Sequence, residues 1–141
     1  MLKGISPLIS PDLLKMLSEM GHGDEIVFGD SNFPAASHAQ RLVRADGHSI
    51  TALLEAVLPL FPLDYAADYS AVLMVFRGDS EPAVWKRYAE ILKQYPDGEK
   101  QFLTLPKPQF YERAKNAYCI VATSESEGFA NLIVRKGVIR I

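Results

Sequence analysis

Apolar runs of strand length alternate along the chain with segments of helical pattern, and this alternation constrains the fold more than any other feature. Three such runs are Glu25–Gly29, Ala71–Phe76 and Tyr118–Ala122. A continuous apolar run is typical of a strand that is covered on both faces. The order predicts an α/β fold, a single-domain layered sheet with helices whose strands are mostly parallel or mixed.

Helix signals stand between these runs. Ser10 is a good N-cap and Pro11 suits the first helical position. A second helix is expected over Ile50–Leu58, because Pro59 cannot continue it. The segments 131–134 and 138–141 predict two strands, or one bent strand, at the end of the chain.

The length of 141 residues allows one domain of ordinary size, here 1–141. At this size a chain buries enough surface for a core without disulfides or metal. The single cysteine, Cys119, lies in an apolar run and is interpreted as a small core residue, since a reactive thiol needs a polar setting.

Charge and motifs exclude several classes of partner. Fifteen Lys and Arg against 17 Asp and Glu give a net charge of -2 without a basic stripe, so we expect no nucleic-acid ligand. No apolar run approaches the roughly 20 residues of a membrane span, and the start lacks a secretory signal, so the expected location is cytoplasmic. No G-x-x-x-x-G-K-[ST] loop occurs, and His38 and His48 have no metal-like spacing. We therefore expect no membrane partner, no cofactor and no metal.

His22 and Asp30 are the first candidate site residues. His22 stands between two glycines, where its imidazole has little steric cover and can exchange a proton near neutral pH. Asp30 follows the strand expected over Glu25–Gly29. At about 3.3 Å per residue the two lie roughly 20 Å apart along that strand, so they share a site only through folded-back loops or another subunit. The alternative is that His22 ends a helix and Asp30 forms a turn.

The second group of candidates lies near the end of the chain. The polar segment 123–131 follows one expected strand and precedes another, where α/β sheets place binding loops. Asn131 has an amide that suits a vicinal diol, and Lys107 follows another expected strand and can donate to hydroxyls. A solvated acidic hairpin and an exposed lysine remain the alternatives.

The residues resemble the L-fucose mutarotase and D-ribose pyranase family over nearly the whole chain. The wording of Glu-Met-Gly-His-Gly-Asp-Glu and Phe-Tyr-Glu-Arg-Ala is closest to the L-fucose mutarotase branch. The matching segments are Met1–Pro11, Glu19–Ile26, Asp30–Ala35, Phe110–Ala114 and Asn131–Gly137.

This resemblance implies a mutarotase/pyranase-like domain that interconverts sugar anomers without cofactor or metal. It also implies a neutral monosaccharide ligand, L-fucose or a related sugar, and a ring-shaped homo-oligomer with sites between neighbouring subunits. The family's acid/base histidine matches His22 and its sugar-contacting aspartate matches Asp30. Lys107 stands where the fucose branch usually has Arg, and Phe129, Ala130 and Asn131 stand where the family has Tyr-x-Asn.

Two further functions stay open beside an L-fucose-type mutarotase. Lysine loses the planar fork of arginine, and Phe129 loses the hydroxyl of tyrosine. These departures leave a sugar-binding or regulatory protein of the same fold with little turnover as the alternative. A purely structural oligomer subunit is the third.

Overall fold

The fold is known from a computed structural model that describes residues 1–141, and it is built on one six-stranded sheet. The order of the strands in the sheet is β2-β5-β1-β6-β3-β4. The strands are β1 (Glu25–Gly29), β2 (Leu42–Ala45), β3 (Val72–Met74), β4 (Leu103–Leu105), β5 (Cys119–Thr123) and β6 (Leu132–Arg135). The helices are α1 (Pro11–Glu19), α2 (Ala35–His38), α3 (Ile50–Val57), α4 (Ala83–Leu92) and α5 (Lys107–Asn116), with a 3-10 turn η1 (Leu58–Leu60).

Strand direction defines two edges of this sheet. β1 and β2 are parallel to β5, β3 is parallel to β4, and β6 runs antiparallel to both of its neighbours. Five strands therefore end at one edge, where β6 begins. We call this the carboxyl edge and the opposite one the amino edge. The predicted α/β fold with a mixed, mostly parallel sheet is confirmed.

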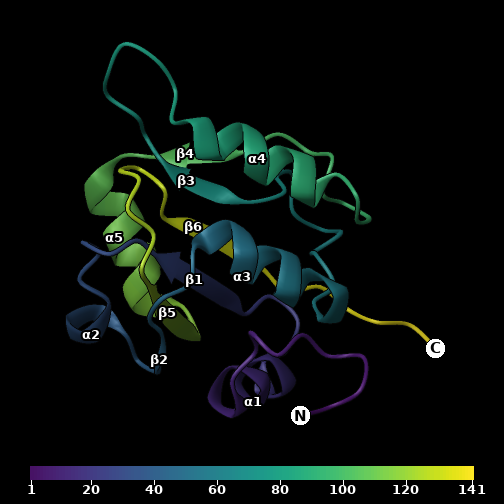
Figure 1. Ribbon diagram of the computed structural model, residues 1–141. Helices are drawn as coiled ribbons and strands as arrows, with labels where there is room; N and C mark the ends of the chain where they lie inside the picture. Colours follow the sequence, from purple (N-terminus) through teal and green to yellow (C-terminus); the bar gives the residue numbers. More distant parts are fainter.

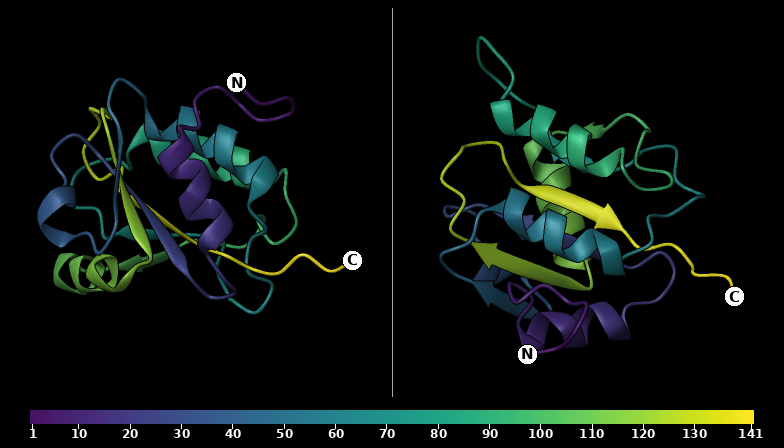
Figure 2. Two further views of the ribbon diagram at one scale, coloured as in Figure 1. Left: turned by 90° about the horizontal axis from the view of Figure 1, so that it is seen from below. Right: turned by 45° about the vertical axis from the view of Figure 1, so that its right-hand side comes forward.

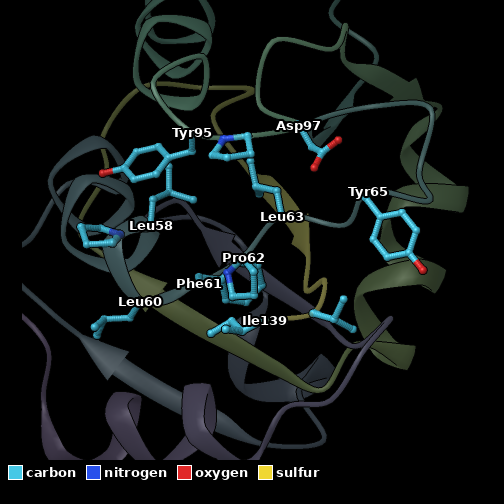
Figure 3. A pocket seen from close by; sticks show the side chains of 12 residues that line it. Leu58, Leu60, Phe61, Pro62, Leu63, Tyr65, Tyr95, Asp97 and Ile139 are labelled. Atoms are coloured by element: carbon cyan, nitrogen blue, oxygen red, sulfur yellow. The ribbon is translucent and has the colours of Figure 1, made fainter. Parts of the chain in front are cut away.

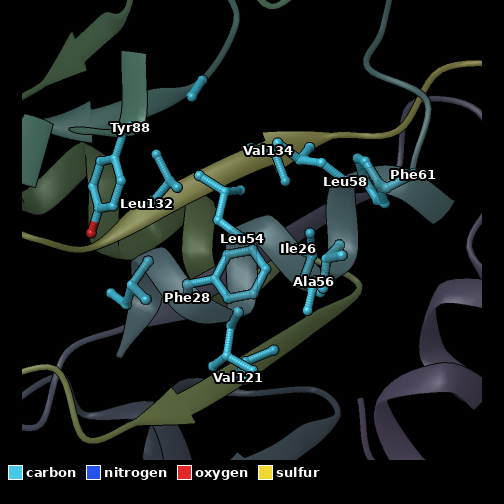
Figure 4. Close-up of a cluster of buried hydrophobic side chains, with 14 of the residues drawn as sticks. Ile26, Phe28, Leu54, Ala56, Leu58, Phe61, Tyr88, Val121, Leu132 and Val134 are labelled. Atoms are coloured by element: carbon cyan, nitrogen blue, oxygen red, sulfur yellow. The ribbon is translucent and has the colours of Figure 1, made fainter. Parts of the chain in front are cut away.

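Helices cover both faces of the sheet. Helices α1, α3 and α4 lie on one face and α2 and α5 on the other (Figure 1, Figure 2). Along β1 the side chains alternate: Ile26 and Phe28 pack into the larger cluster (Figure 4), whereas Val27 packs under α5. Because both faces are covered, the central strands are apolar throughout, as the continuous runs predict.

The predicted cap Ser10 and the predicted core residue Cys119 are confirmed. The Ser10 hydroxyl accepts from Leu13 N–H at 3.1 Å and begins α1, and Ser49 does the same for α3. The helix expected over Ile50–Leu58 ends at Val57, and Pro59 lies in the 3-10 turn that follows. Cys119 is fully buried, and burial raises the pKa of its thiol to about 12, which makes it a core residue.

The structure differs from the sequence-based expectation at three places, and the first is the short helix α2, which was not predicted. β2 was not predicted, and as the outermost strand of the sheet it pairs with one neighbour, β5. The last segment, Val138–Ile141, forms no strand: Gly137 N–H donates to Pro62 O at 2.8 Å, and the exposed tail then leaves the sheet (Figure 1). No helix is long and apolar enough to cross a membrane.

Candidate functional site

A pocket of about 210 Å³ opens at the carboxyl edge and brings together four of the predicted site residues. Asp30 follows β1, Lys107 begins α5 after β4, and Phe129 and Asn131 precede β6. Because these strand ends meet at one edge, residues about 100 positions apart become neighbours. The rest of the lining comes from Asn32, Phe33, Met74 and Tyr111.

Asp30 is held by its backbone and is partly desolvated. Its N–H donates to Asn131 Oδ1 at 2.7 Å, and its own Oδ1 accepts from Asn32 N–H at 2.9 Å. Burial raises the pKa of the Asp30 carboxyl and the charge of Glu125 adds to this, while the N–H groups of Asn32 and Phe33 oppose it. The carboxyl is therefore a strong acceptor that gains a proton more readily than a solvated aspartate.

Asn131 has one free end for a ligand. Its side chain is buried, and its oxygen already accepts from Asp30 N–H. The sequence predicted a contact through both ends of the amide. The structure leaves Nδ2, a donor, for the pocket, because the oxygen orders the loop that carries Asp30.

The segment Phe129-Ala130 is presented by α4. Trp85 Nε1–H donates to Phe129 O at 2.8 Å, and the Tyr88 hydroxyl donates to Ala130 O at 2.7 Å. These bonds hold the backbone of Phe129 at φ +56, a conformation that residues other than glycine rarely adopt. The Phe129 ring lines the pocket, whereas Ala130 is fully buried and contributes only its backbone.

Lys107 offers a free positive charge. Its ammonium lies 5.3 Å from the centroid of the Tyr111 ring and makes no ion pair with a carboxylate. A second hollow of about 390 Å³ adjoins the pocket and shares Met74, Lys107 and Phe129 with it. Lys107 is thus exposed, as the alternative held, and it also lines the predicted site.

His22 lies at the amino edge, beyond the opposite end of β1, and does not line this pocket. Its Nε2 is 3.0 Å from Asp64 Oδ1, which also accepts from Ala66 N–H at 3.0 Å. The other oxygen, Oδ2, lies 2.8 Å from Arg135 Nε in a charge contact without hydrogen-bond alignment. The structure therefore does not bring His22 and Asp30 together within one chain.

Asp64 is a buried partner of His22 that the sequence did not predict. Its side chain is 1% exposed. Burial alone raises the pKa of a carboxyl, but the Ala66 N–H, the hydrogen bond to His22 and the charge of Arg135 together hold the pKa of Asp64 below its ordinary value. No spacing signal links it to His22, because 42 positions separate them.

The glycines around His22 have separate tasks. Gly23 has φ +89, and a Cβ there would lie 3.3 Å from Arg135 Nη2, so glycine lets the guanidinium pass. Gly21 N–H donates to Asp24 Oδ2 at 2.7 Å, which holds the turn. Since α1 ends at Glu19, His22 is not a helix-terminal residue, which excludes the alternative for His22, whereas Asp30 does form the turn that the alternative predicted.

Tyr65 stacks on the His22 ring, with centroids 5.8 Å apart and an angle of 20° between the planes. It also borders the largest hollow, about 490 Å³, which is lined mostly by apolar side chains (Figure 3). None of the predicted site residues lines that hollow. No group of three or more His, Cys, Asp or Glu side chains is placed to hold a metal ion.

Comparison with known proteins gives consistent matches. The model of the RbsD / FucU transport protein family matches residues 3–139. An L-fucose mutarotase of Histophilus somni strain 2336 is 46% identical over 140 residues, which cover 98% of this chain and 97% of that protein. The crystal structure of the fucose mutarotase from Streptococcus pneumoniae in complex with L-fucose superposes with a TM-score of 0.93 at 48% identity, covering 99% of this chain and 100% of that chain. The crystal structure of FucU from Bifidobacterium longum superposes with a TM-score of 0.92 at 45% identity, covering 98% of this chain and 100% of that chain.

Proposed function

Because this chain belongs to the RbsD / FucU transport protein family, we propose that it is an L-fucose mutarotase, an isomerase that interconverts the α and β anomers of the sugar. The predicted family resemblance is confirmed. The cytoplasmic location, the single-domain boundary 1–141 and the independence from cofactor and metal stay predictions.

One observation carries the proposal: the pocket at the carboxyl edge combines acceptor, donor and apolar groups around a volume of about 210 Å³. A monosaccharide presents hydroxyls around its rim and C–H groups on its faces. Asp30 accepts from hydroxyls, and Lys107 and Asn131 Nδ2 donate to them. The rings of Phe129 and Tyr111 offer apolar surface for a sugar face.

The sugar site is completed by a second copy of the chain. His22 is the candidate acid/base group, yet it lies at the other end of β1 from the pocket. A homo-oligomer that sets the amino edge of one subunit against the carboxyl edge of the next supplies His22 in trans. Such head-to-tail contacts close into a ring when the rotation between subunits permits.

Ring opening requires one proton gained and one lost. The imidazolium of His22 gives a proton to the ring oxygen while the C1–O bond breaks, its electron pair staying on that oxygen. The anomeric hydroxyl loses its proton to water, and C1 becomes a carbonyl. Rotation about the C1–C2 bond and the reverse steps close the other anomer. Proton transfer of this kind contributes typically about 10²–10⁴-fold.

Exchange NMR on anomer signals tests this function directly. We expect the protein to accelerate α/β exchange of L-fucose more than that of L-rhamnose, D-ribose or D-galactose. Exchange at the buffer rate for all four sugars would overturn the proposal. Saturation-transfer binding with no acceleration would instead support the sugar-binding alternative that Lys107 and Phe129 motivate.

Mixed oligomers test the shared site. His22→Ala and Asp30→Ala each disable half of a site, so each homo-oligomer should be inactive. Random co-assembly by co-expression places an intact His22 against an intact Asp30 pocket at about one quarter of the contacts. We expect that share of wild-type exchange to return. Absence of any rescue in oligomers shown to be mixed would place both residues in one chain's site.

A further inference from the structure

We propose that Asp64 is a positioning residue that holds the Nε2–H of His22, so that Nδ1 is the atom that exchanges a proton with the sugar. The inference rests on the proposed function for the role of Nδ1, but its structural part stands on the amino edge alone. His22 Nε2 lies 3.0 Å from Asp64 Oδ1, and no protein group contacts Nδ1 at hydrogen-bond distance.

The surroundings require an acceptor at Asp64. Its Oδ1 accepts from Ala66 N–H, and its Oδ2 faces the guanidinium of Arg135 at 2.8 Å. A group that accepts on both oxygens and carries a negative charge satisfies every neighbour, and only an ionised carboxylate does so. Facing such a group, a neutral imidazole places its single proton on Nε2.

The carboxylate is charged and immobile. With its side chain 1% exposed, Asp64 cannot turn toward water, and its partners keep its pKa low. Arg135 is the last residue of β6, and its guanidinium passes over Gly23, where a Cβ would lie 3.3 Å from Nη2. The ring itself is fixed on one face by Tyr65. The imidazole therefore has a defined orientation before any sugar binds.

Other charged or titratable groups at this edge leave Nδ1 free. Asp24 is bonded to Gly21 N–H, and the Lys136 ammonium is bonded to the carbonyls of Leu17 and Met20. Arg140 lies over the Tyr65 ring, 5.5 Å from its centroid. The exposed fraction of the His22 side chain is 42%, so Nδ1 is accessible to a ligand that docks from outside the chain.

The proton steps follow from this orientation. The imidazolium donates its Nδ1 proton to the ring oxygen of the sugar as the sugar ring opens. Its Nε2–H remains hydrogen-bonded to Asp64. The neutral ring that remains has its lone pair on Nδ1 and takes the proton back when the oxygen closes on C1. The carboxylate keeps its charge throughout and accepts from Nε2–H in both forms of the ring.

Imidazole nitrogen NMR on ¹⁵N-histidine protein tests the orientation without any sugar. Three histidines are present, and the His22 signals are identified by their loss in His22→Gln. In the wild type we expect the neutral ring to carry its proton on Nε2. A wild-type ring protonated mainly on Nδ1 overturns the proposal, whatever the outcome of the fucose assay. Failure of the wild type to accelerate anomer exchange instead overturns the proposed function and leaves this result standing.

Substitution of Asp64 separates positioning from mere structure. In Asp64→Asn the NH₂ group that avoids the Arg135 guanidinium takes the place of Oδ1, so it faces His22 and gives up the bond from Ala66 N–H, and the ring proton should move to Nδ1. We expect the rate of anomer exchange to fall by up to the whole contribution of acid/base catalysis, about 10²–10⁴-fold, while the affinity for fucose changes little. Asp46→Asn breaks an exposed Arg–Asp pair and is the matched control, expected to change neither signal nor rate.

The double variant Asp64→Asn with Arg135→Met tests whether Arg135 sets the orientation of the amide. Without the guanidinium, the amide NH₂ can turn away and its oxygen can face His22 again. We expect the Nε2–H form to return, together with part of the lost rate. An unchanged tautomer and rate in folded Asp64→Leu, which has no oxygen to face His22, would overturn the positioning role. If that variant does not fold, the tautomer of the wild type and of Arg135→Met decides, and both should be Nε2–H.

Discussion

The carboxyl edge of the sheet gathers hydroxyl-binding groups around an open pocket, whereas the amino edge holds an imidazole against a buried carboxylate that faces a partly exposed arginine. One aspartate at each edge has a shifted pKa, and the two shifts have opposite directions. Asp30 has a raised pKa because burial outweighs its two N–H donors, and Asp64 has a lowered one because its partners outweigh burial. The same residue type thus serves as an adaptable ligand contact at one edge and a fixed charge at the other.

The contrast explains how so small a chain supports a reaction. Binding groups that must adapt to a ligand lie on loops after strand ends, while the proton-transfer group is held by structure that is complete in one chain. In the oligomer that we propose, joining the two edges between subunits avoids the need for a deep cleft within 141 residues.

The strongest test of this division is His22→Ala. Removing the imidazole should lower fucose anomer exchange by about 10²–10⁴-fold, the usual contribution of general acid/base catalysis. It should also lower the free energy of unfolding by about 1–3 kcal/mol, because the buried Asp64 carboxylate loses its bond to the ring. Exchange NMR and urea unfolding measure the two effects. His48→Ala is the control, because His48 makes hydrogen bonds only through its backbone. Equal rates in His22→Ala and wild type would remove the catalytic role from the amino edge.

Asn131→Ala tests the carboxyl edge. It leaves Asp30 N–H without its acceptor, so we expect the free energy of unfolding to fall by about 1–3 kcal/mol. Fucose affinity should fall as well, because the loop that carries Asp30 loosens. The exposed Asn116→Ala should stay within about 0.5 kcal/mol of wild type. A variant that binds fucose normally would show that Asn131 does not support the pocket.

These elements differ in how far the sequence could predict them. β1 and β5 were found because their apolar runs are local, and the capped α1 was found for the same reason. β2 was missed because only Val43 and Ala45 are buried in it and Arg44 interrupts the pattern. The segment after Gly137 has the apolar pattern of a strand, but no neighbouring strand pairs with it.

The site shows the same limit. Asp30, Lys107, Phe129 and Asn131 were predicted from loop chemistry and family resemblance, and the pocket unites them. The Asp64 contact could not be predicted, because a pairing over 42 positions leaves no periodic signal. Long-range contacts become visible only when the strand order is known.

Acid titration of stability separates the two aspartates. Asp64 has a lowered folded pKa, so its stabilisation is present above the ordinary aspartate pKa and is lost as pH falls through the lowered value. Asp30 has a raised folded pKa, so its ionised form destabilises the fold, and this cost disappears as pH falls through the raised value. Chemical unfolding between pH 7 and pH 3 should therefore show a flatter loss in Asp64→Asn and a steeper loss in Asp30→Asn. Identical slopes would contradict the opposite environments.

Phe129→Tyr and Lys107→Arg should have the smallest effects, and they sharpen the assignment of binding to the carboxyl edge. Each adds donor capacity at the pocket rim without touching the amino edge, so affinity for L-fucose should rise by up to about fivefold, the equivalent of one hydrogen bond of ~1 kcal/mol. The tautomer of His22 should not change. Calorimetry measures the affinity, and Lys86→Arg on α4, outside the pocket lining, is the control. A rate increase of a hundredfold without tighter binding would mean that a hydroxyl or guanidinium at this edge takes part in proton transfer, and the separation of binding from catalysis would fail.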